Sequence, residues 1–467
     1  MPEGTALELA IAIKEKKLTV PEVVNAYIEK IEKYDKEYKT FLTVIKENAL
    51  QRAHEVQAHI NSGETLSPLA GVPIALKDNI SVKEIEMTCA SKMLKGYKPV
   101  FNATVVEKLE NAGLIVIGKL NMDEFALGAS SDCSAAAIAA GEVPLAIGTD
   151  TGGNIRQSCA FCGVTGIKPT YGSVSRFGIA AYASSLDQAG PIGQDINDCA
   201  ALLSIISGPD EKDGTCVIEK PFDFFNDSTQ DVKGIKIGIP NNFINSSMAA
   251  VDEDIKTAIL AAAKEYKEIG AIVEEFEMPL IDYIIPAYCI IGSAEASSNL
   301  AKYDGLKYGY RSANAKTLSE TYRLSRSEGF GLEVKRKILF GSFVLSAGNY
   351  DTYYRKALQV RTLIKDAYKK LFGHFDVILS PVTPATAYKS GNNIDDPMKV
   401  YMENLFTASV NLAGLPAVAL PCGFDKQELP IGFQLIGNTF SEKRLIDTAR
   451  IYQSRTGYHK RKPGGIS

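Results

Sequence analysis

The chain has 467 residues, and 51 Lys and Arg stand against 55 Asp and Glu, so its formal net charge is −4. Hydrophobic residues make up 45% and charged residues 23%, proportions typical of a globular protein, which exclude global disorder. The near-neutral charge balance argues against a strongly basic nucleic-acid surface. The length favours either two domains or one large α/β domain on a wide sheet.

The sequence contains no stretch of about 18 apolar residues, so we expect no membrane-spanning helix. The N-terminus has the pattern of an amphipathic helix rather than of a signal peptide. Eight cysteines are scattered along the chain, and at this length they do not form a disulfide framework. We therefore expect a cytoplasmic protein.

The first third of the chain alternates helical and strand patterns, which indicates an α/β sheet with helices on its faces. Thr19 is the expected cap of the second helix. The expected order is helix 5–16, helix 21–34, strand 41–45, helix 47–60, strand 72–76, helix 105–112, strand 114–117, helix 134–140 and strand 144–148.

A second α/β stretch follows a polar turn at 208–214. The section at about 281–372 is mostly helical and is expected to form a cap over the sheet, but no change in composition marks a domain boundary. The expected elements are strand 236–239, helix 251–269, strand 271–276, strand 376–380, helix 400–413, strands 417–421 and 431–436, and helix 442–454.

The segment from Gly148 to Gln157 reads Gly-Thr-Asp-Thr-Gly-Gly-Asn-Ile-Arg-Gln, between a buried strand and a predicted helix. Paired glycines allow backbone N–H groups to point toward one place, and a helix N-terminus adds partial positive charge. This is the construction of an oxyanion hole. The alternative is a tight strand-to-helix turn with no chemistry.

Chemistry in this part of the chain would have to run without a local histidine base, because none of the four histidines lies between residues 60 and 373. Lys77 ends an apolar strand, where partial burial makes its neutral amine accessible as a base. The alternative is an ordinary lysine at a strand end. Ser130, Ser131 and Ser134 precede a helix and could equally be caps. We expect no metal site, since the pair Cys159 and Cys162 has no second pair at zinc-site spacing.

These segments resemble the amidase-signature family, and within it the A subunits of glutamyl-tRNA(Gln) or aspartyl-tRNA(Asn) amidotransferases. The resemblance covers nearly the whole chain and implies a single domain over 1–467 built on a large mixed central sheet flanked by helices. It is carried by Lys77, by the serine-rich segment before Ala135, by the run from Gly148 to Gly172, by Ser184-Ser185-Leu186-Asp187-Gln188, and by Asn411-Leu412-Ala413-Gly414-Leu415-Pro416.

The family's chemistry uses a serine nucleophile, a bridging serine in a cis peptide and a lysine base. Carried over by position, Lys77 is the base, Ser130 the bridging serine, and Thr151, Gly152 and Gly153 the oxyanion hole. The nucleophile position is occupied by Asn154, whose amide nitrogen has its lone pair delocalised and cannot form the acyl intermediate. The resemblance therefore predicts impaired or lost hydrolysis.

Two further departures concern the bridge and the substrate. Most of the family's loop between Gly128 and the serine-rich segment is absent, and another alignment would delete the bridging serine altogether. The glutamine carboxylate would be held by Lys337 in place of an arginine. A lysine ammonium cannot reproduce the two parallel hydrogen bonds of a guanidinium. The glutamine amino group would meet Asn404 in place of an acid, with Glu403 one residue away.

By resemblance, the family's A chain releases ammonia from glutamine, and the ammonia passes to a B subunit that uses ATP and Mg and engages the tRNA, while a small C subunit wraps the pair. This chain itself would need no cofactor. Two other hypotheses remain open: a non-catalytic binding or regulatory protein on the same scaffold, and an amide hydrolase with another nucleophile. Candidates for that nucleophile are Ser130, Ser131, Cys133, Ser134, Ser158 and Cys159.

Overall fold

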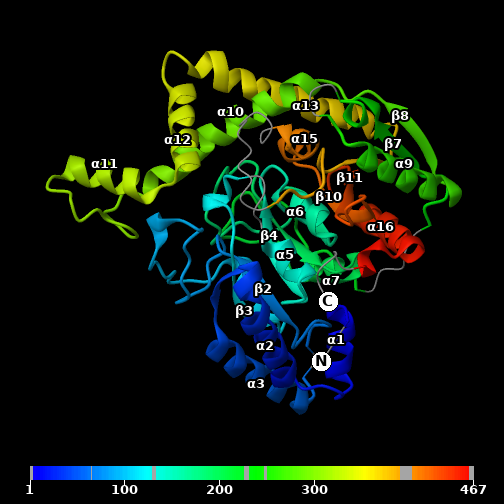
Figure 1. Cartoon of the computed structure of the whole chain (residues 1–467), viewed down its shortest axis with the longest axis horizontal. Coiled ribbons are helices and arrows are strands. Elements are labelled where there is room, and N and C mark those ends of the chain that lie inside the picture. The colour runs from blue at the N-terminus through cyan, green and yellow to red at the C-terminus, as the bar shows by residue number, and fades with distance from the viewer. Residues whose placement is uncertain are drawn as a thin grey trace.

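The computed structural model describes residues 4–64, 66–128, 133–225, 231–246, 250–389 and 402–461. Their strands form one mixed sheet in the order β1-β3-β2-β4-β6-β5-β10-β11-β9-β7-β8, flanked by helices (Figure 1). The strands are β1 (Phe41–Val44), β2 (Pro73–Lys77), β3 (Ile115–Leu120), β4 (Leu145–Asp150), β5 (Thr165–Lys168), β6 (Gln188–Gly193), β7 (Lys236–Pro240), β8 (Ile272–Phe276), β9 (Val377–Pro381), β10 (Ala417–Phe424) and β11 (Pro430–Gly437). The predicted α/β fold class with a large mixed sheet is confirmed.

The helices cover the faces of this sheet and extend beyond it at one end (Figure 1). They are α1 (Ala6–Lys14), α2 (Val20–Tyr38), α3 (Lys46–Ser62), α4 (Thr104–Asn111), α5 (Cys133–Ala139), α6 (Asn154–Cys162), α7 (Ile196–Ile206), α8 (Asn241–Ile244), α9 (Glu253–Glu268), α10 (Ile281–Asn299), α11 (Leu318–Gly329), α12 (Leu332–Leu345), α13 (Arg355–Leu371), α15 (Leu405–Ala413) and α16 (Glu442–Thr456). No helix of the described residues is both long enough and apolar enough to cross a membrane.

Local sequence explains where the first helices begin. Thr19 caps α2 by accepting from the N–H of Glu22, whose carboxylate accepts from the N–H of Thr19 in return. The same reciprocal pair, a capping box, opens α1 at Thr5 and Glu8. The predicted cap at Thr19 is therefore confirmed.

The central strands alternate their side chains between two apolar clusters. In β2, Ile74 and Leu76 belong to the larger cluster, whereas Ala75 belongs to the smaller one on the other face. Strand β2 pairs in parallel with β4, with Leu76 opposite Ile147. Because parallel strands end at the same edge of a sheet, the end of β2 lies next to the segment that follows β4.

The sequence prediction missed β5, β6 and α7. Strands β5 and β6 contain glycine and proline, which break the alternating pattern by which strands are recognised. Gly190 in β6 is required there, because a Cβ would overlap the carbonyl oxygen of Ile167. The helix expected over 400–413 begins at Leu405 in the structure, and residues 400 and 401 lie outside the described part.

The section at 281–372 is helical, as predicted. Helices α10 and α13 run along the top of the molecule, and α12 and then α11 lead outward from their end (Figure 1). Helix α10 packs against both α12 and α13. This layer brings Tyr288 of α10 against Gly152, in the segment that follows β4.

Candidate active site

Lys77 is the last residue of β2, and its side chain is only 1% exposed. Its Nζ donates to the carbonyl oxygen of Thr149, 3.3 Å away. Asn79 holds the same residue by donating from Nδ2 to the Thr149 hydroxyl at 3.0 Å. The parallel pairing of β2 and β4 thus places the predicted base against the end of β4, two residues before Thr151, where the loop with the predicted oxyanion hole begins.

The loop after β4 is fixed by a buried carboxylate. The Thr151 hydroxyl donates to Oδ1 of Asp187 at 2.6 Å, and Asp187 also accepts from the N–H groups of Tyr182 and Ala183. Burial raises the pKa of Asp187 to about 6. This contact pins the loop to the start of β6, since Gln188 lies opposite Asp150 in the antiparallel pair.

Two glycines complete the loop, and the structure explains both. A Cβ on Gly152 would overlap the hydroxyl of Tyr288, and Gly153 has a φ of +139°, a conformation that L side chains rarely adopt. The Thr407 hydroxyl donates to the carbonyl oxygen of Gly152 at 2.5 Å. Within the described residues, the N–H groups of Thr151, Gly152 and Gly153 have no hydrogen-bond acceptor, so they are available to an anion.

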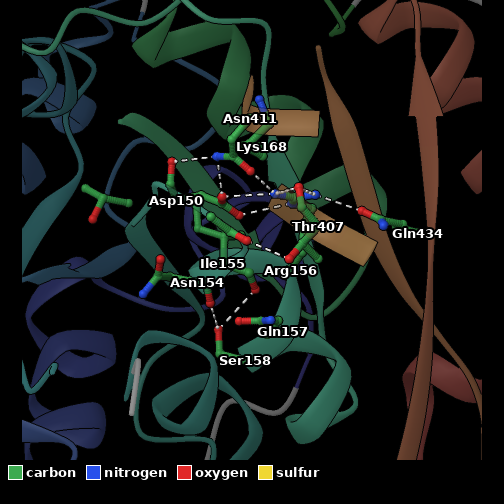
Figure 2. Close-up of polar contacts among 12 residues, drawn as sticks. Asp150, Asn154, Ile155, Arg156, Gln157, Ser158, Lys168, Thr407, Asn411 and Gln434 are labelled. Carbon is green, nitrogen blue, oxygen red and sulfur yellow. Dashed lines mark hydrogen bonds and ion pairs between the residues drawn. The ribbon is translucent and has the colours of Figure 1, made fainter. Parts of the chain in front are cut away.

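Asn154 is the first residue of α6 and is 8% exposed. Its Nδ2 donates to the carbonyl oxygen of Gly128 at 3.2 Å. Figure 2 shows its side chain directed away from that of Arg156, two residues later. The position therefore presents a carboxamide at the N-terminus of the helix.

A buried network anchors α6 behind the loop (Figure 2). The Arg156 guanidinium, 0% exposed, pairs with both carboxylate oxygens of Asp150 at 3.1 Å. Its remaining donors reach the Thr407 carbonyl, the Gln434 side chain at 2.8 Å and the Asn411 side chain at 2.5 Å. The end of β4, helix α15 and strand β11 thereby fix the orientation of the helix and of the loop before it.

Asn404 joins the site through the same helix. Gln157, one turn after Asn154, donates from Nε2 to the Asn404 side chain at 3.3 Å and to the carbonyl oxygen of Glu403 at 2.9 Å. One carboxylate oxygen of Glu403 and the amide oxygen of Gln157 are buried without a hydrogen-bond partner among the described residues. Burial raises the pKa of Glu403 to about 7.

Glu403 and Gln157 therefore give the site two unused acceptors. The sequence analysis mentioned Glu403 only as a neighbour of Asn404 and did not single out Gln157. Unused buried acceptors favour a ligand with N–H donors, such as an ammonium group. The only sequence signal for these two acceptors was Glu403, a carboxylate next to Asn404, the position at which the family is expected to carry an acidic residue.

Lys337 lies on the inner face of α12 and is 5% exposed. Burial raises the pKa of the Cys289 thiol on α10, and the positive charge of Lys337 lowers it by a smaller amount. Cys289 follows Tyr288, whose hydroxyl closes over Gly152. Lys337 is thus placed on the side of α12 that packs against α10.

Ser130 and Ser131 lie outside the described residues. Of the other proposed nucleophiles, Ser158 donates its hydroxyl to the carbonyl oxygens of Asn154 and Ile155, at 2.7 and 3.0 Å. Cys159 is fully buried, with its sulfur against Gly166 of β5. Neither is directed at the loop. No cluster of three or more metal-ligating side chains occurs in the described ranges.

A glycine-rich loop beside a buried lysine, on a large mixed sheet, is an arrangement found in amidases, and comparison with known proteins agrees. The amidase family model matches residues 22–133 and 127–446, so the chain belongs to the amidase family. The two matches overlap at residues 127–133.

Within that family, the chain is similar to the A subunits of glutamyl-tRNA(Gln) amidotransferases from several bacteria. It is 50% identical to the protein of Lachnoclostridium phytofermentans over 98% of each chain, and 50% identical to that of Agathobacter rectalis over 96% of this chain and 93% of the other. The crystal structure of the corresponding Thermotoga maritima protein is 36% identical, covers 97% of this chain and 95% of its own, and superimposes with a TM-score of 0.79.

Proposed function

We propose that this chain is a relative of the amidotransferase A subunits in which glutamine hydrolysis is impaired or lost. The observation that carries the proposal is Asn154 at the N-terminus of α6, immediately after the loop whose N–H groups have no acceptor among the described residues. The anion-binding half of the machinery is kept, but the attacking oxygen is replaced by an amide. Loss of a nucleophile costs on the order of a million-fold in other hydrolases.

The shortened loop supports the same proposal. The alignment with the L. phytofermentans relative runs over 488 positions, more than the 467 residues of this chain, so part of the relative has no counterpart here. The proposal assigns the missing part to the segment that would supply Ser130, next to the boundary between the two family matches at 127–133. In this proposal Lys77 keeps the position of the base, but its partner serine is displaced or missing.

The substrate pocket keeps polar groups suited to a small amino acid. We propose that Lys337 faces the carboxylate of glutamine, and that Asn404 lies near its amino group. The charge that an ammonium requires is supplied by Glu403, because Asn404 carries none. Binding of glutamine should therefore be weaker than with an arginine and an aspartate at these positions, but not abolished.

We further propose that the chain assembles with B and C subunits in the cytoplasm, and contributes there to protein biosynthesis as part of a ligase complex. ATP, Mg and tRNA would be handled by the B subunit. The names of the relatives support this proposal, since each is one of the subunits of a tRNA-dependent amidotransferase.

The test is a glutaminase assay of the purified chain beside its Asn154→Ser variant. We expect no ammonia release above background from the natural sequence. The Asn154→Ser variant should recover glutamine hydrolysis only in part, because in this proposal the segment that supplies the bridging serine is shortened. Robust glutamine hydrolysis with Asn154 intact would contradict the proposal and favour another nucleophile.

A further inference from the structure

Helix α11 buries one face and leaves another open. Ser325 and Gly329 are its buried residues, and a Cβ on Gly329 would overlap the Cε atom of Met93. On another face, side chains spaced three and four residues apart line a hollow of about 520 Å³ between α11 and α12. These side chains belong to Ser319, Tyr322, Arg323, Arg326 and Ser327. Figure 1 shows α11 projecting outward from the end of α12, so a ligand can approach both helices from solvent.

The second wall of the hollow comes from Phe330 and from the first turns of α12. The residues of α12 that line it are Lys335, Ile338 and Leu339, and Leu339 is 71% exposed. The two arginines of α11 and Lys335 give the hollow three positive charges, and no carboxylate lines it. This charge favours an anionic ligand, provided that no neighbouring acid neutralises it.

The acids of the two helices are engaged elsewhere. Glu320 accepts from backbone N–H groups at the start of α11, and Glu328 accepts from two hydroxyl groups of the preceding loop. Glu333 pairs with an exposed arginine of its own helix at 3.4 Å. Two acids outside these helices, Asp304 and Glu124, act electrostatically on cations of the hollow but form no ion pair with them in the described part of the chain. The three positive charges are therefore left for a ligand.

Backbone contacts hold two of the three cations in place. Arg326 donates from Nη1 to two carbonyl oxygens of the segment after α10, at 2.8 and 2.9 Å. Its guanidinium also lies over the ring of Phe330, 5.1 Å from the centroid. Lys335 donates from Nζ to the carbonyl oxygen of Ser327 at 3.1 Å. Because these partners are neutral, they fix the positions of the charges without cancelling them.

Arg323 is the cation that no other group uses. No carboxylate, carbonyl or hydroxyl of the described residues accepts a hydrogen bond from its guanidinium. Ser319 lies one turn before it, on the first turn of α11, where the helix N-terminus adds partial positive charge. Tyr322, next to Arg323 in sequence, contributes a side chain that is 40% exposed. The open face of α11 thus offers an unpaired guanidinium, a hydroxyl and an aromatic ring within two turns.

A phosphate ester matches this charge better than a carboxylate does. A phosphate group carries a charge of about −1.5 to −2 and three acceptor oxygens, so it can meet several cations at once. A guanidinium binds it through two parallel hydrogen bonds. The volume of the hollow also lies within the range of small-molecule sites, about 300–1,000 Å³.

The apolar part of the hollow indicates what the phosphate is attached to. Tyr322 and Leu339 offer an aromatic and an aliphatic surface of the kind against which a planar base packs. A sugar phosphate would leave these surfaces uncovered. We propose that the hollow between α11 and α12 binds a nucleoside phosphate, with the phosphate among the three cations and the base against Tyr322 and Leu339. This inference depends neither on the glutamine pocket nor on the proposed function.

The experiment is calorimetric titration of the full chain with AMP, adenosine and inorganic phosphate. We expect saturable binding of AMP and weaker binding of adenosine and of phosphate, because each of these fills only part of the hollow. Arg323→Ala should weaken AMP binding at least about tenfold, because a charge-assisted contact to the phosphate is lost. Arg336→Ala is the matched control, since it removes the same charge from an exposed position on α12 that does not line the hollow. It should bind AMP as the natural chain does.

Variants of Tyr322 separate the base from the phosphate. Tyr322→Ala should weaken AMP binding and leave the binding of inorganic phosphate unchanged. Tyr322→Phe keeps the ring and should bind AMP as the natural chain does. Circular dichroism of each variant distinguishes loss of binding from misfolding.

Three results would overturn the proposal. The first is a natural chain that does not bind AMP. The second is an equal loss of affinity in Arg323→Ala and Arg336→Ala, which would show general attraction by surface charge. The third is binding of a single-stranded RNA oligonucleotide without binding of AMP, which would assign the cations to a nucleic-acid backbone. None of these results changes the outcome of the glutaminase assay, which tests the proposed function separately.

Discussion

The side-chain amide of Asn154 donates a hydrogen bond to the carbonyl oxygen of Gly128, and 3.2 Å separate the nitrogen from the oxygen. Asn154 opens α6, and Gly128 is the last residue described before 129–132. The contact therefore joins the first turn of the helix to the segment that directly precedes the serine-rich residues. A serine hydroxyl, one bond closer to the backbone, would not replace the amide as this donor without a shift of the backbone.

Asn154→Ala should lower the free energy of unfolding by about 1 kcal/mol, because the partly buried carbonyl oxygen of Gly128 loses its donor. The measurement is the urea midpoint at constant slope. Asn61→Ala, at an exposed position on α3, is the control and should change stability by less than about 0.5 kcal/mol. An Asn154 variant as stable as the natural chain would mean that this hydrogen bond contributes nothing to the fold.

Arg156→Met should cost about 3–5 kcal/mol, because it leaves the Asp150 carboxylate buried with the Asn411 amide as its donor and the Lys168 charge nearby, but without its ion-pair partner. Arg455→Met removes an ion pair to Glu265 of similar length, 3.2 Å, from a half-exposed position, and should cost less than about 1 kcal/mol. Thermal and urea unfolding measure the loss of unfolding free energy in the Arg156→Met and Arg455→Met variants.

If Arg156→Met does not fold, the double variant Arg156→Met/Asp150→Asn should recover part of the lost free energy of unfolding, because the charge of Asp150 is then also removed. Equal losses for the Arg156 and Arg455 variants would contradict the role assigned to the buried network.

Thr151→Val should destabilise the chain by about 1.5–3 kcal/mol at pH 7, because the ionised Asp187 loses a charge-assisted hydrogen bond. The pKa of Asp187 is about 6, and the Thr151 hydroxyl lowers it against the larger effect of burial. The hydroxyl's contribution is therefore present above pH 6 and is lost as the pH falls through that value.

The difference in unfolding free energy between Thr151→Val and the natural chain should accordingly shrink from pH 7 to pH 5. Thr151→Ser keeps the hydroxyl and should stay close to the natural chain at both values. A gap that does not change with pH would show that the ionisation of Asp187 is not coupled to this contact.

Glutamine binding should strengthen as the pH rises through 7, because only the ionised form of Glu403 attracts an ammonium group and burial raises its pKa to about 7. The affinity should rise by up to about tenfold per pH unit below that value and level off above it. Titration calorimetry of the natural chain and of Glu403→Gln measures this.

Glu403→Gln should bind more weakly at pH 8 and lose the pH dependence between 6 and 8. Glu211→Gln, at an exposed position away from the site, should behave as the natural chain does. A Glu403→Gln variant that retains the full pH profile would remove Glu403 from the pocket.

Much of the fold could be predicted because local patterns agree with the final contacts. Thr19 and Glu22 mark the start of α2 within a single turn, and the apolar strands β2 and β4 are continuous in sequence. Strands β5 and β6 could not be found in this way. Their glycines are needed where backbones approach each other, as at Gly190, and this approach is a tertiary property.

The candidate site was only partly predictable. Lys77 and the loop 151–153 follow strands that pair in parallel, so their proximity follows from the α/β pattern. The contacts that fix the loop do not follow from this pattern, because Asp187 lies 36 residues from Thr151 and Gln434 lies 278 residues from Arg156. The unused oxygen of Glu403 likewise depends on burial, which sequence spacing does not give.

Covalent trapping tests most directly whether any side chain of this protein attacks a glutamine carboxamide. The natural chain is incubated with an electrophilic glutamine analogue, and its intact mass and peptide masses are then measured. We expect an unchanged mass, since position 154 offers a carboxamide in place of a nucleophilic oxygen. A stoichiometric adduct on any serine, threonine or cysteine of the pocket would contradict the proposed loss of hydrolysis.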